Sequence, residues 1–221
     1  MRYKIQGEIA QQVILKPDAG ETVWTSNGAL MAYSPGVAWS LRVPGGMSGA
    51  VRRSFAGEGV SLTYLETQGE NATVLLAANQ PGHVMPWDLQ SDGPVITTRG
   101  AFLAAFGPEI DINVTVAKRA GAAFFGGAGL FLQRVSGVGT VLIHGSGDFY
   151  EQTLATGTAM TVSTGNLAAF AADVDYDIRG VGGCRNILFS GEGLFMTHLT
   201  GPGRVLLQTL KRETGGSSSG S

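Results

Sequence analysis

Three histidines, His83, His144 and His198, are all the imidazoles that could bind a metal ion or transfer a proton near neutral pH. Metalloenzymes built on β-strands often place two ligands in a His-x-His pair, which puts both imidazoles on one face of a strand. The chain contains no such pair. We therefore interpret the three histidines as ordinary strand or loop residues, and we expect no metal site.

Two acidic runs, Glu109-Ile110-Asp111 and Asp173-Val174-Asp175-Tyr176-Asp177, place carboxylates at every second position. In a strand these carboxylates would share one face, where they could chelate a hard cation or form a catalytic pair. The same alternation is typical of any half-buried strand, and the sixth-position glycine and terminal glutamate of a calcium loop are missing. We favour a solvated strand face.

The remaining reactive candidates also lack the pattern that their chemistry needs. Cys184 is the single cysteine, so an internal disulfide is excluded, and with no CxxC partner it is best interpreted as a small buried residue. The repeated Gly-x-Gly phrases precede Leu-Phe strands rather than a helix, which indicates turn and close-packing glycines instead of a dinucleotide site. The sequence predicts no catalytic residue, no cofactor and no enzyme activity.

One candidate surface follows the internal symmetry of the chain. Before each Gly-x-Gly phrase lies a glycine-rich segment that combines cations with apolar side chains, and we call these the cationic segments. Such segments suit an anionic lipid surface, an acidic partner or a contact between copies, and they could equally be solvated loop corners. Their members are Arg52, Arg53, Phe55, Lys118, Arg119, Phe124, Phe125, Arg185, Leu188 and Phe189.

The chain contains an internal sequence repeat, so the elements that carry these residues should recur as well. The phrase Gly-x-Gly-Leu-Phe, followed by Gly-x-Gly and Val-Leu, occurs at 127–142 and again 64 residues later at 191–206, and a looser copy begins at Gly57. Residues 93–142 and 157–206 share 16 identities in 50 positions, which indicates a duplication. We expect one globular domain over 1–211, with repeats at about 8–80, 81–147 and 148–211 around a pseudo-three-fold axis.

Each repeat is predicted to be all-β. The runs 130–135 and 140–144 flank a glycine turn, which predicts a hairpin, and 193–199 with 204–209 and 60–65 with 73–77 predict two more. Small and aromatic residues indicate further strands upstream at 29–33, 102–106 and 166–170. Only the stretches before each Gly-x-Gly phrase, such as 49–55, have room for a helical turn.

The bulk composition narrows the class of partner. Charged residues make up 14% of the chain, and 34 of its 221 residues are glycine, which indicates a compact, turn-rich protein that self-associates or docks on a partner. A net charge of -2 argues against nucleic-acid binding. No secretory h-region or transmembrane run is visible, so we expect a cytoplasmic protein, with peripheral membrane contact left open. Residues 212–221 have the composition of a flexible Gly/Ser tail.

The repeat phrases resemble those of a known family. Gly-Gly-x-Gly-Leu-Phe at 126–131, its variant at 190–195 and the ending at 200–209 are similar to the altered-inheritance-of-mitochondria protein 24 family. That family is assigned to the tryptophan RNA-binding attenuator protein-like superfamily, and the resemblance covers 1–211. It implies a fold of the double-stranded β-helix kind with three repeats and brings no catalytic motif. The lack of a mitochondrial presequence suggests a bacterial member.

The predicted function is a non-enzymatic structural or interaction scaffold. It would form a homo-oligomer or dock on a protein partner or an anionic membrane surface. The alternative is a small-molecule binding protein with a pocket between repeats, by analogy with the fold's tryptophan-binding relatives. RNA binding is disfavoured by the acidic pI near 5.9 and by a total of four lysines, and a metal-dependent enzyme lacks its ligand pattern.

Overall fold

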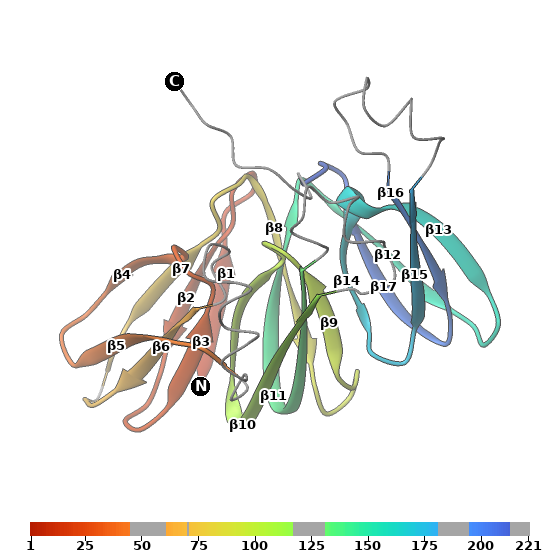
Figure 1. Ribbon diagram of the computed structural model, residues 1–221. Coiled ribbons are helices and arrows are strands. Elements are labelled where there is room, and N and C mark those ends of the chain that lie inside the picture. The colour runs from red at the N-terminus through yellow and green to blue at the C-terminus, as the bar shows by residue number, and fades with distance from the viewer. Residues whose placement is uncertain (45–60, 70, 117–130, 181–194, 213–221) are drawn as a thin grey trace.

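The computed structural model describes residues 1–44, 61–69, 71–116, 131–180 and 195–212, and over these ranges the predicted all-β class is confirmed (Figure 1). The strands form where apolar residues alternate, as in β2, where buried Val13 and Leu15 point to the opposite face from their neighbours. The described elements are β1 (Arg2–Gln6), β2 (Gln12–Lys16), β3 (Thr22–Thr25), β4 (Leu30–Tyr33), β5 (Val37–Arg42), β6 (Leu62–Thr67), β7 (Val74–Ala77), β8 (Gly82–Asp88), β9 (Val95–Thr98), β10 (Phe102–Val116), β11 (Phe131–Ser146), β12 (Phe149–Leu154), β13 (Ala159–Ser163), the 3-10 helix η1 (Thr164–Asn166), β14 (Leu167–Ala171), β15 (Asp175–Gly180), β16 (Phe195–Thr200) and β17 (Gly203–Gln208).

The strands form three sheets. A four-stranded sheet has the order β1-β2-β7-β4. The largest sheet has ten strands: β12-β17-β14-β9-β11-β10-β3-β6-β5, with β8 paired to β11 beside this path. A three-stranded sheet has the order β13-β16-β15. All the strand pairs within these sheets are antiparallel, which is the arrangement that short connections permit.

One order of pairing occurs in three consecutive stretches, which we call the first (β2–β7), middle (β8–β11) and last (β12–β17) stretch. In the first, β2 and β4 flank β7, whereas β3 and β5 flank β6. In the last, β12 and β14 flank β17, whereas β13 and β15 flank β16. In the middle, β8 and the start of β10 flank the second half of β11, whereas β9 and the rest of β10 flank its first half.

Two strand pairs join the stretches. β3 pairs with the start of β10, which connects the first stretch to the middle one, and β9 pairs with β14, which connects the middle stretch to the last. A buried threonine hydroxyl strengthens each junction: Thr25 Oγ1 donates to the carbonyl of Leu103 (2.8 Å), and Thr98 Oγ1 donates to the carbonyl of Leu167 (2.7 Å). The middle stretch therefore lies between the other two, with β4 and β13 at opposite ends of the molecule (Figure 1).

The three hairpins predicted from the glycine turns are wrong. β6 and β7 do not pair with each other, nor do β16 and β17, because the members of each couple lie in different sheets. In the middle stretch the two predicted arms form one continuous strand, β11. Gly137 and Gly139 have φ values of 110° and 152°. A Cβ at Gly137 would collide with the carbonyl oxygen of Glu109 on β10, and a Cβ at Gly139 would collide with that of Phe106. These glycines therefore do not form a turn in the chain. They allow β10 and β11 to approach each other closely.

The core is continuous across the two junctions. One buried cluster contains Trp87, Phe102 and Phe170 and joins the middle and last stretches. A second cluster contains Leu15, Leu76 and Leu103 and joins the first stretch to the middle one. Residues 102–106 of β10 and the whole of β14 are buried. The strand in the matching place of the first stretch, β4, is largely exposed.

Candidate functional site

The cationic segments and Cys184 lie outside the residues that the structure describes, as does the possible helical turn at 49–55. The candidate docking residues Arg52, Arg53, Phe55, Lys118, Arg119, Phe124, Phe125, Arg185, Leu188 and Phe189 therefore stay predictions.

The histidines lie on three different strands. Nδ1 of His83 on β8 is 2.9 Å from the carbonyl oxygen of Gly147, and Nδ1 of His198 on β16 is 2.9 Å from Thr161 Oγ1. His144 is buried on β11. Within the described ranges no group of three or more histidines, cysteines and acidic residues could hold a metal ion.

The first acidic run lies on a strand face open to solvent, whereas the second begins in the turn before β15 and ends at half-buried Asp177. Glu109 and Asp111 of β10 are exposed and precede buried Ile112. Asp175 of β15 is exposed between buried Val174 and, further along, buried Ile178. This alternation agrees with the interpretation of a solvated strand face.

Buried His144 is hydrogen-bonded to Arg212, and the pKa values of both side chains are lowered. Arg212 Nη2 donates to His144 Nδ1 (2.6 Å) and to the His144 carbonyl oxygen (2.9 Å). Burial, with the Arg212 charge as the second cause, lowers the pKa of His144 to about 4, so the imidazole is neutral and accepts at Nδ1. Burial also lowers the pKa of Arg212, to about 10, which leaves the guanidinium charged at neutral pH.

The other terminal nitrogen of this guanidinium is not satisfied. Arg212 Nη1 is buried and has no hydrogen-bond acceptor among the described residues. Buried polar groups in native proteins are almost always paired, and a buried charged donor without an acceptor is costly. Such an atom in a native fold calls for an explanation, which can be an ion or a ligand that occupies the site in solution.

Arg212 lines a cavity of about 460 Å³ at the junction of the first and middle stretches. Its walls come from the ends of β3 and β7, the turn between β9 and β10, β11 and the chain after β17. Three cationic side chains line it, and no aspartate or glutamate is among its described lining residues. The lining residues are Ser26, Asn27, Ala29, Ala77, Ala78, Asn79, Gln80, Arg99, Gly100, Phe102, Leu103, His144, Lys211 and Arg212.

Sequence reasoning missed this cavity because its residues come from five separate parts of the chain. Arg212 was placed in the flexible tail, yet its backbone N–H donates to the carbonyl of Gly165 (2.9 Å) and its side chain lies on His144. No spacing rule connects Arg99 with Lys211, and Arg99 also has an interaction partner of its own. The one local signal was Lys211-Arg212, a cationic pair at the border of a Gly/Ser-rich stretch.

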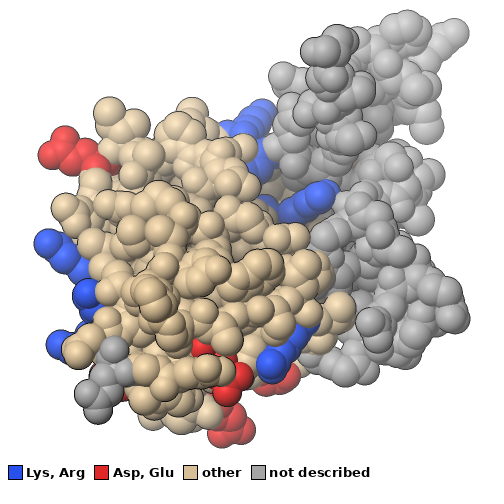
Figure 2. Space-filling model, turned by 90° about the vertical axis from the view of Figure 1, so that its left-hand side faces the viewer, with Lys and Arg blue, Asp and Glu red and all other residues tan. Residues whose placement is uncertain are grey.

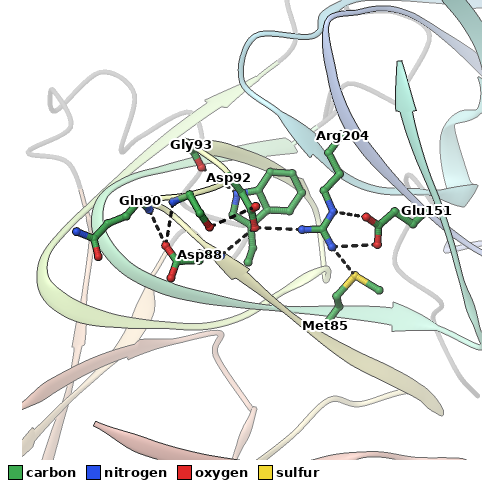
Figure 3. Close-up of polar contacts among 9 residues, drawn as sticks. Met85, Asp88, Gln90, Asp92, Gly93, Glu151 and Arg204 are labelled. Carbon is green, nitrogen blue, oxygen red and sulfur yellow. Dashed lines mark hydrogen bonds and ion pairs between the residues drawn. The ribbon is translucent and has the colours of Figure 1, made fainter. Parts of the chain in front are cut away.

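A second half-buried arginine, Arg204 on β17, is fully paired (Figure 3). Its Nε and Nη2 bind the two carboxylate oxygens of Glu151 (2.7 and 3.0 Å), and its Nη1 binds Asp92 (3.1 Å). Nη2 also contacts Met85 Sδ (3.2 Å), and the guanidinium lies 4.7 Å from the ring centre of buried Trp87. Because all its nitrogens are occupied, we interpret Arg204 as a structural connection between the last and middle stretches.

The first stretch exposes apolar side chains at its outer end. Met31 and Tyr33 of β4 are 53% and 47% exposed, and Trp39 and Leu41 of β5 are 51% and 55% exposed. Trp39 Nε1 donates to the Tyr33 hydroxyl (3.2 Å), which fixes the two rings together. Figure 2 shows this end of the molecule as a mostly uncharged surface, with lysine and arginine side chains near its edges and carboxylates at the bottom and at the upper left.

Comparisons with known proteins place the chain among bacterial relatives. An uncharacterized protein of Streptococcus pyogenes serotype M6 is 30% identical over 222 residues, which cover 96% of this chain and 87% of that protein. The crystal structure of another Streptococcus pyogenes protein matches with a TM-score of 0.78 at 26% identity, over 95% of this chain and 94% of that one. None of the described helical residues forms a segment long and apolar enough to cross a membrane.

The family profile described as mitochondrial biogenesis AIM24 matches residues 3–210, which is nearly the whole chain. This match confirms the resemblance carried by the Gly-x-Gly-Leu-Phe phrases. The chain belongs to the AIM24 family.

Proposed function

We propose that the protein is a non-enzymatic scaffold that self-associates end to end, with β4 of one copy against β13 of the next. The observation that carries this proposal is the exposure of β4, whose counterparts in the pairing scheme, the start of β10 (residues 102–106) and β14, are buried at the junctions between stretches. An exposed strand edge with apolar side chains is a template for pairing with another chain.

The two junctions within the chain supply the geometry for this contact. The start of β10 is covered by β3, and β14 is covered by β9, both through antiparallel pairs. β13 has the place of β3 and β9 in the last stretch, and among the described strands it pairs with β16 alone, as β4 pairs with β7 alone. A second copy that offered β13 to β4 would therefore repeat a contact that the chain already makes twice.

The finer architecture belongs to the same proposal. We infer three repeats, each a unit of the double-stranded β-helix or β-sandwich kind, related by pseudo-three-fold symmetry. The recurrence of one pairing order in the three stretches supports this, as does the duplication of the glycine phrases. Because β4 and β13 lie at opposite ends, the contact between copies is head-to-tail, and such contacts build rings or filaments.

Sedimentation velocity on two edge variants tests the proposal. Met31→Lys places a charge on β4, and Thr161→Lys places one at an exposed position of β13. Each variant alone should be monomeric where the wild type is oligomeric, and an equal mixture should form dimers, because each variant keeps one intact edge. Ile9→Lys, at a position 79% exposed and away from both strands, is the control and should assemble normally.

Other outcomes would overturn this arrangement. An oligomer that survives both single variants would place the contact elsewhere, and a mixture that stays monomeric would exclude the head-to-tail contact. A monomeric wild type would favour the other form of the scaffold function, in which this end docks on a different, membrane-associated partner.

A second candidate function, the binding of a small molecule between repeats, is favoured by the cavity beside Arg212. It lies where the first and middle stretches meet, and its volume of about 460 Å³ is in the ordinary range for ligand sites. The scaffold function and this one are compatible, because the cavity residues lie on neither β4 nor β13.

A further inference from the structure

We infer that the cavity binds a small organic oxyanion, a carboxylate or a phosphate monoester, whose charged end is held by Arg212 and Lys211. This inference rests on the second candidate function and adds to it the chemical class of the ligand. It is independent of self-association.

The unpaired nitrogen of Arg212 is the first argument. The guanidinium is planar and has five N–H donors in a fixed fork that matches carboxylate and phosphate oxygens. Arg212 Nη2 donates to Nδ1 and to the carbonyl oxygen of His144, whereas buried Nη1 has no acceptor among the described residues. An oxyanion in the cavity would satisfy Nη1 with a charge-assisted hydrogen bond.

The guanidinium is also held in place before any ligand arrives. The Arg212 backbone N–H is bonded to Gly165, and its side chain passes over Gly100, where an added Cβ would lie 3.4 Å from Arg212 Cδ. Neutral His144 fixes the far end of the side chain as an acceptor. His144 is thus a positioning residue, and a pre-organised donor loses less conformational entropy when it binds.

Charge around the cavity favours an anion. Lys211 adds an exposed ammonium, and Arg99, which has an interaction partner of its own, also lines the cavity. With no carboxylate among the described lining residues, the charges of Lys211 and Arg212 favour an anion over a cation in the cavity. Arg204 makes the opposite case, because its charge is already balanced by Glu151 and Asp92.

The size and the remaining wall indicate an organic ligand rather than a single inorganic ion. A volume of about 460 Å³ is many times that of one water molecule or one chloride. Ala29, Ala77 and Ala78 give part of the wall an apolar surface. Asn27, Asn79 and Gln80 add neutral polar groups that can bind hydroxyl or amide groups of the ligand.

NMR titration of the ¹⁵N-labelled full chain tests the inference with three probes at constant ionic strength: inorganic phosphate, succinate and its neutral analogue succinamide. Phosphate or succinate should shift the Arg212 Nε–Hε and His144 ring signals in a saturable way, and succinamide should not. A response to phosphate alone would assign the phosphate class, and a response to succinate alone would assign the carboxylate class.

Two substitutions provide the matched comparison. Arg212→Gln should weaken the binding of the responding anion by about tenfold or more, because it removes a charge-assisted hydrogen bond. Arg134→Gln, which removes an exposed arginine from β11 outside the cavity, should leave the binding unchanged. The mapping of the wild-type signals does not depend on whether the variant folds.

Three results would overturn the inference. Equal binding of succinamide and succinate would show a pocket without anion selectivity, so the second candidate function would stand without the anion. Unchanged anion binding in Arg212→Gln would place the anion elsewhere. No response to any of the three probes would contradict both the anion site and the small-molecule function.

Discussion

Two arginines near the junctions between stretches, Arg204 and Arg212, have opposite surroundings. Arg204 lies on a regular strand, β17, and its three guanidinium nitrogens all have partners, two of them on one carboxylate. Arg212 follows the last strand, its guanidinium donates to one neutral histidine, and Nη1 has no partner among the described residues. One guanidinium is neutralised within the fold, and the other keeps a free donor at the wall of a cavity.

The acceptors around each arginine, rather than its position at a junction, therefore decide its role. A bidentate carboxylate uses up the directional donors of the guanidinium and balances its charge. A neutral imidazole orients the group and leaves the charge unbalanced. We therefore expect Arg204 to act on stability and Arg212 to act mainly on binding.

Acid should have the largest effect on the free energy of unfolding, through His144, the partner of Arg212. The pKa of His144 is lowered from 6.5 to about 4 in the folded protein, so the unfolded chain binds the extra proton first as the pH falls. The stabilisation is complete above pH 6.5 and is lost as the pH falls from 6.5 towards 4, by up to about 3 kcal/mol. Urea unfolding at pH 7, 6, 5 and 4.5 measures this loss.

The control for the acid effect is His144→Gln, which keeps an acceptor for Arg212 and removes the titration. Its free energy of unfolding should fall less than that of the wild type over the same pH interval. Parallel curves for the two proteins would show that the acid sensitivity comes from other groups.

Arg204→Gln should have the next largest effect, a loss of about 2 kcal/mol in the free energy of unfolding. It breaks the pairs with Glu151 and Asp92 and the contact with Trp87, and the partial exposure of Glu151 limits the cost. Arg179→Gln is the matched control. Arg179 pairs with Asp177, but its side chain is 70% exposed, so we expect less than about 0.5 kcal/mol.

Urea unfolding of both variants at neutral pH compares the two losses. Equal small losses would mean that the Arg204 cluster is no stronger than an ordinary surface pair. The interpretation of Arg204 as a structural connection would then fail.

The sequence predicted the strand class and the family, but not how the strands pair. Alternating Val13 and Leu15, or the small and aromatic run of β14, are local patterns that give a strand whatever its partner. The choice between a hairpin and a continuous strand at Gly137 and Gly139 depends on β10, which lies close enough to leave no room for a side chain. That contact is long-range, so the glycine spacing alone could not distinguish the two.

The cavity was unpredictable for the same reason. Its wall combines neutral His144 with charged Arg212, 68 residues further on, and the composition of 212–221 predicts a flexible tail there. The exposed end was missed as well, because Trp39 and Leu41 look like core residues in a sequence. Only the burial of the start of β10 and of β14, in matching places, shows that β4 lacks a cover.

The buried threonines of the two junctions should contribute equally to the free energy of unfolding. Thr25→Val and Thr98→Val each remove a buried hydroxyl that donates to a leucine carbonyl on the partner strand. Each should cost about 1 kcal/mol in the free energy of unfolding, measured with urea. Equal losses would show that the strand pairs at the two junctions are equivalent and that the arginines alone differ. A loss confined to Thr98→Val would mean that the first junction is weaker throughout.

Arg212→Gln should have the smallest effect on stability, below about 1 kcal/mol in urea unfolding at pH 7. The substitution removes two hydrogen bonds to His144, but it also removes a buried donor that has no acceptor among the described residues, and these changes offset each other. The same substitution at Arg204 is the matched reference, since there every bond lost was satisfied. A loss at Arg212 as large as that at Arg204 would show that the guanidinium is a structural connection after all. A small loss together with weakened anion binding would separate the two roles as the acceptors predict.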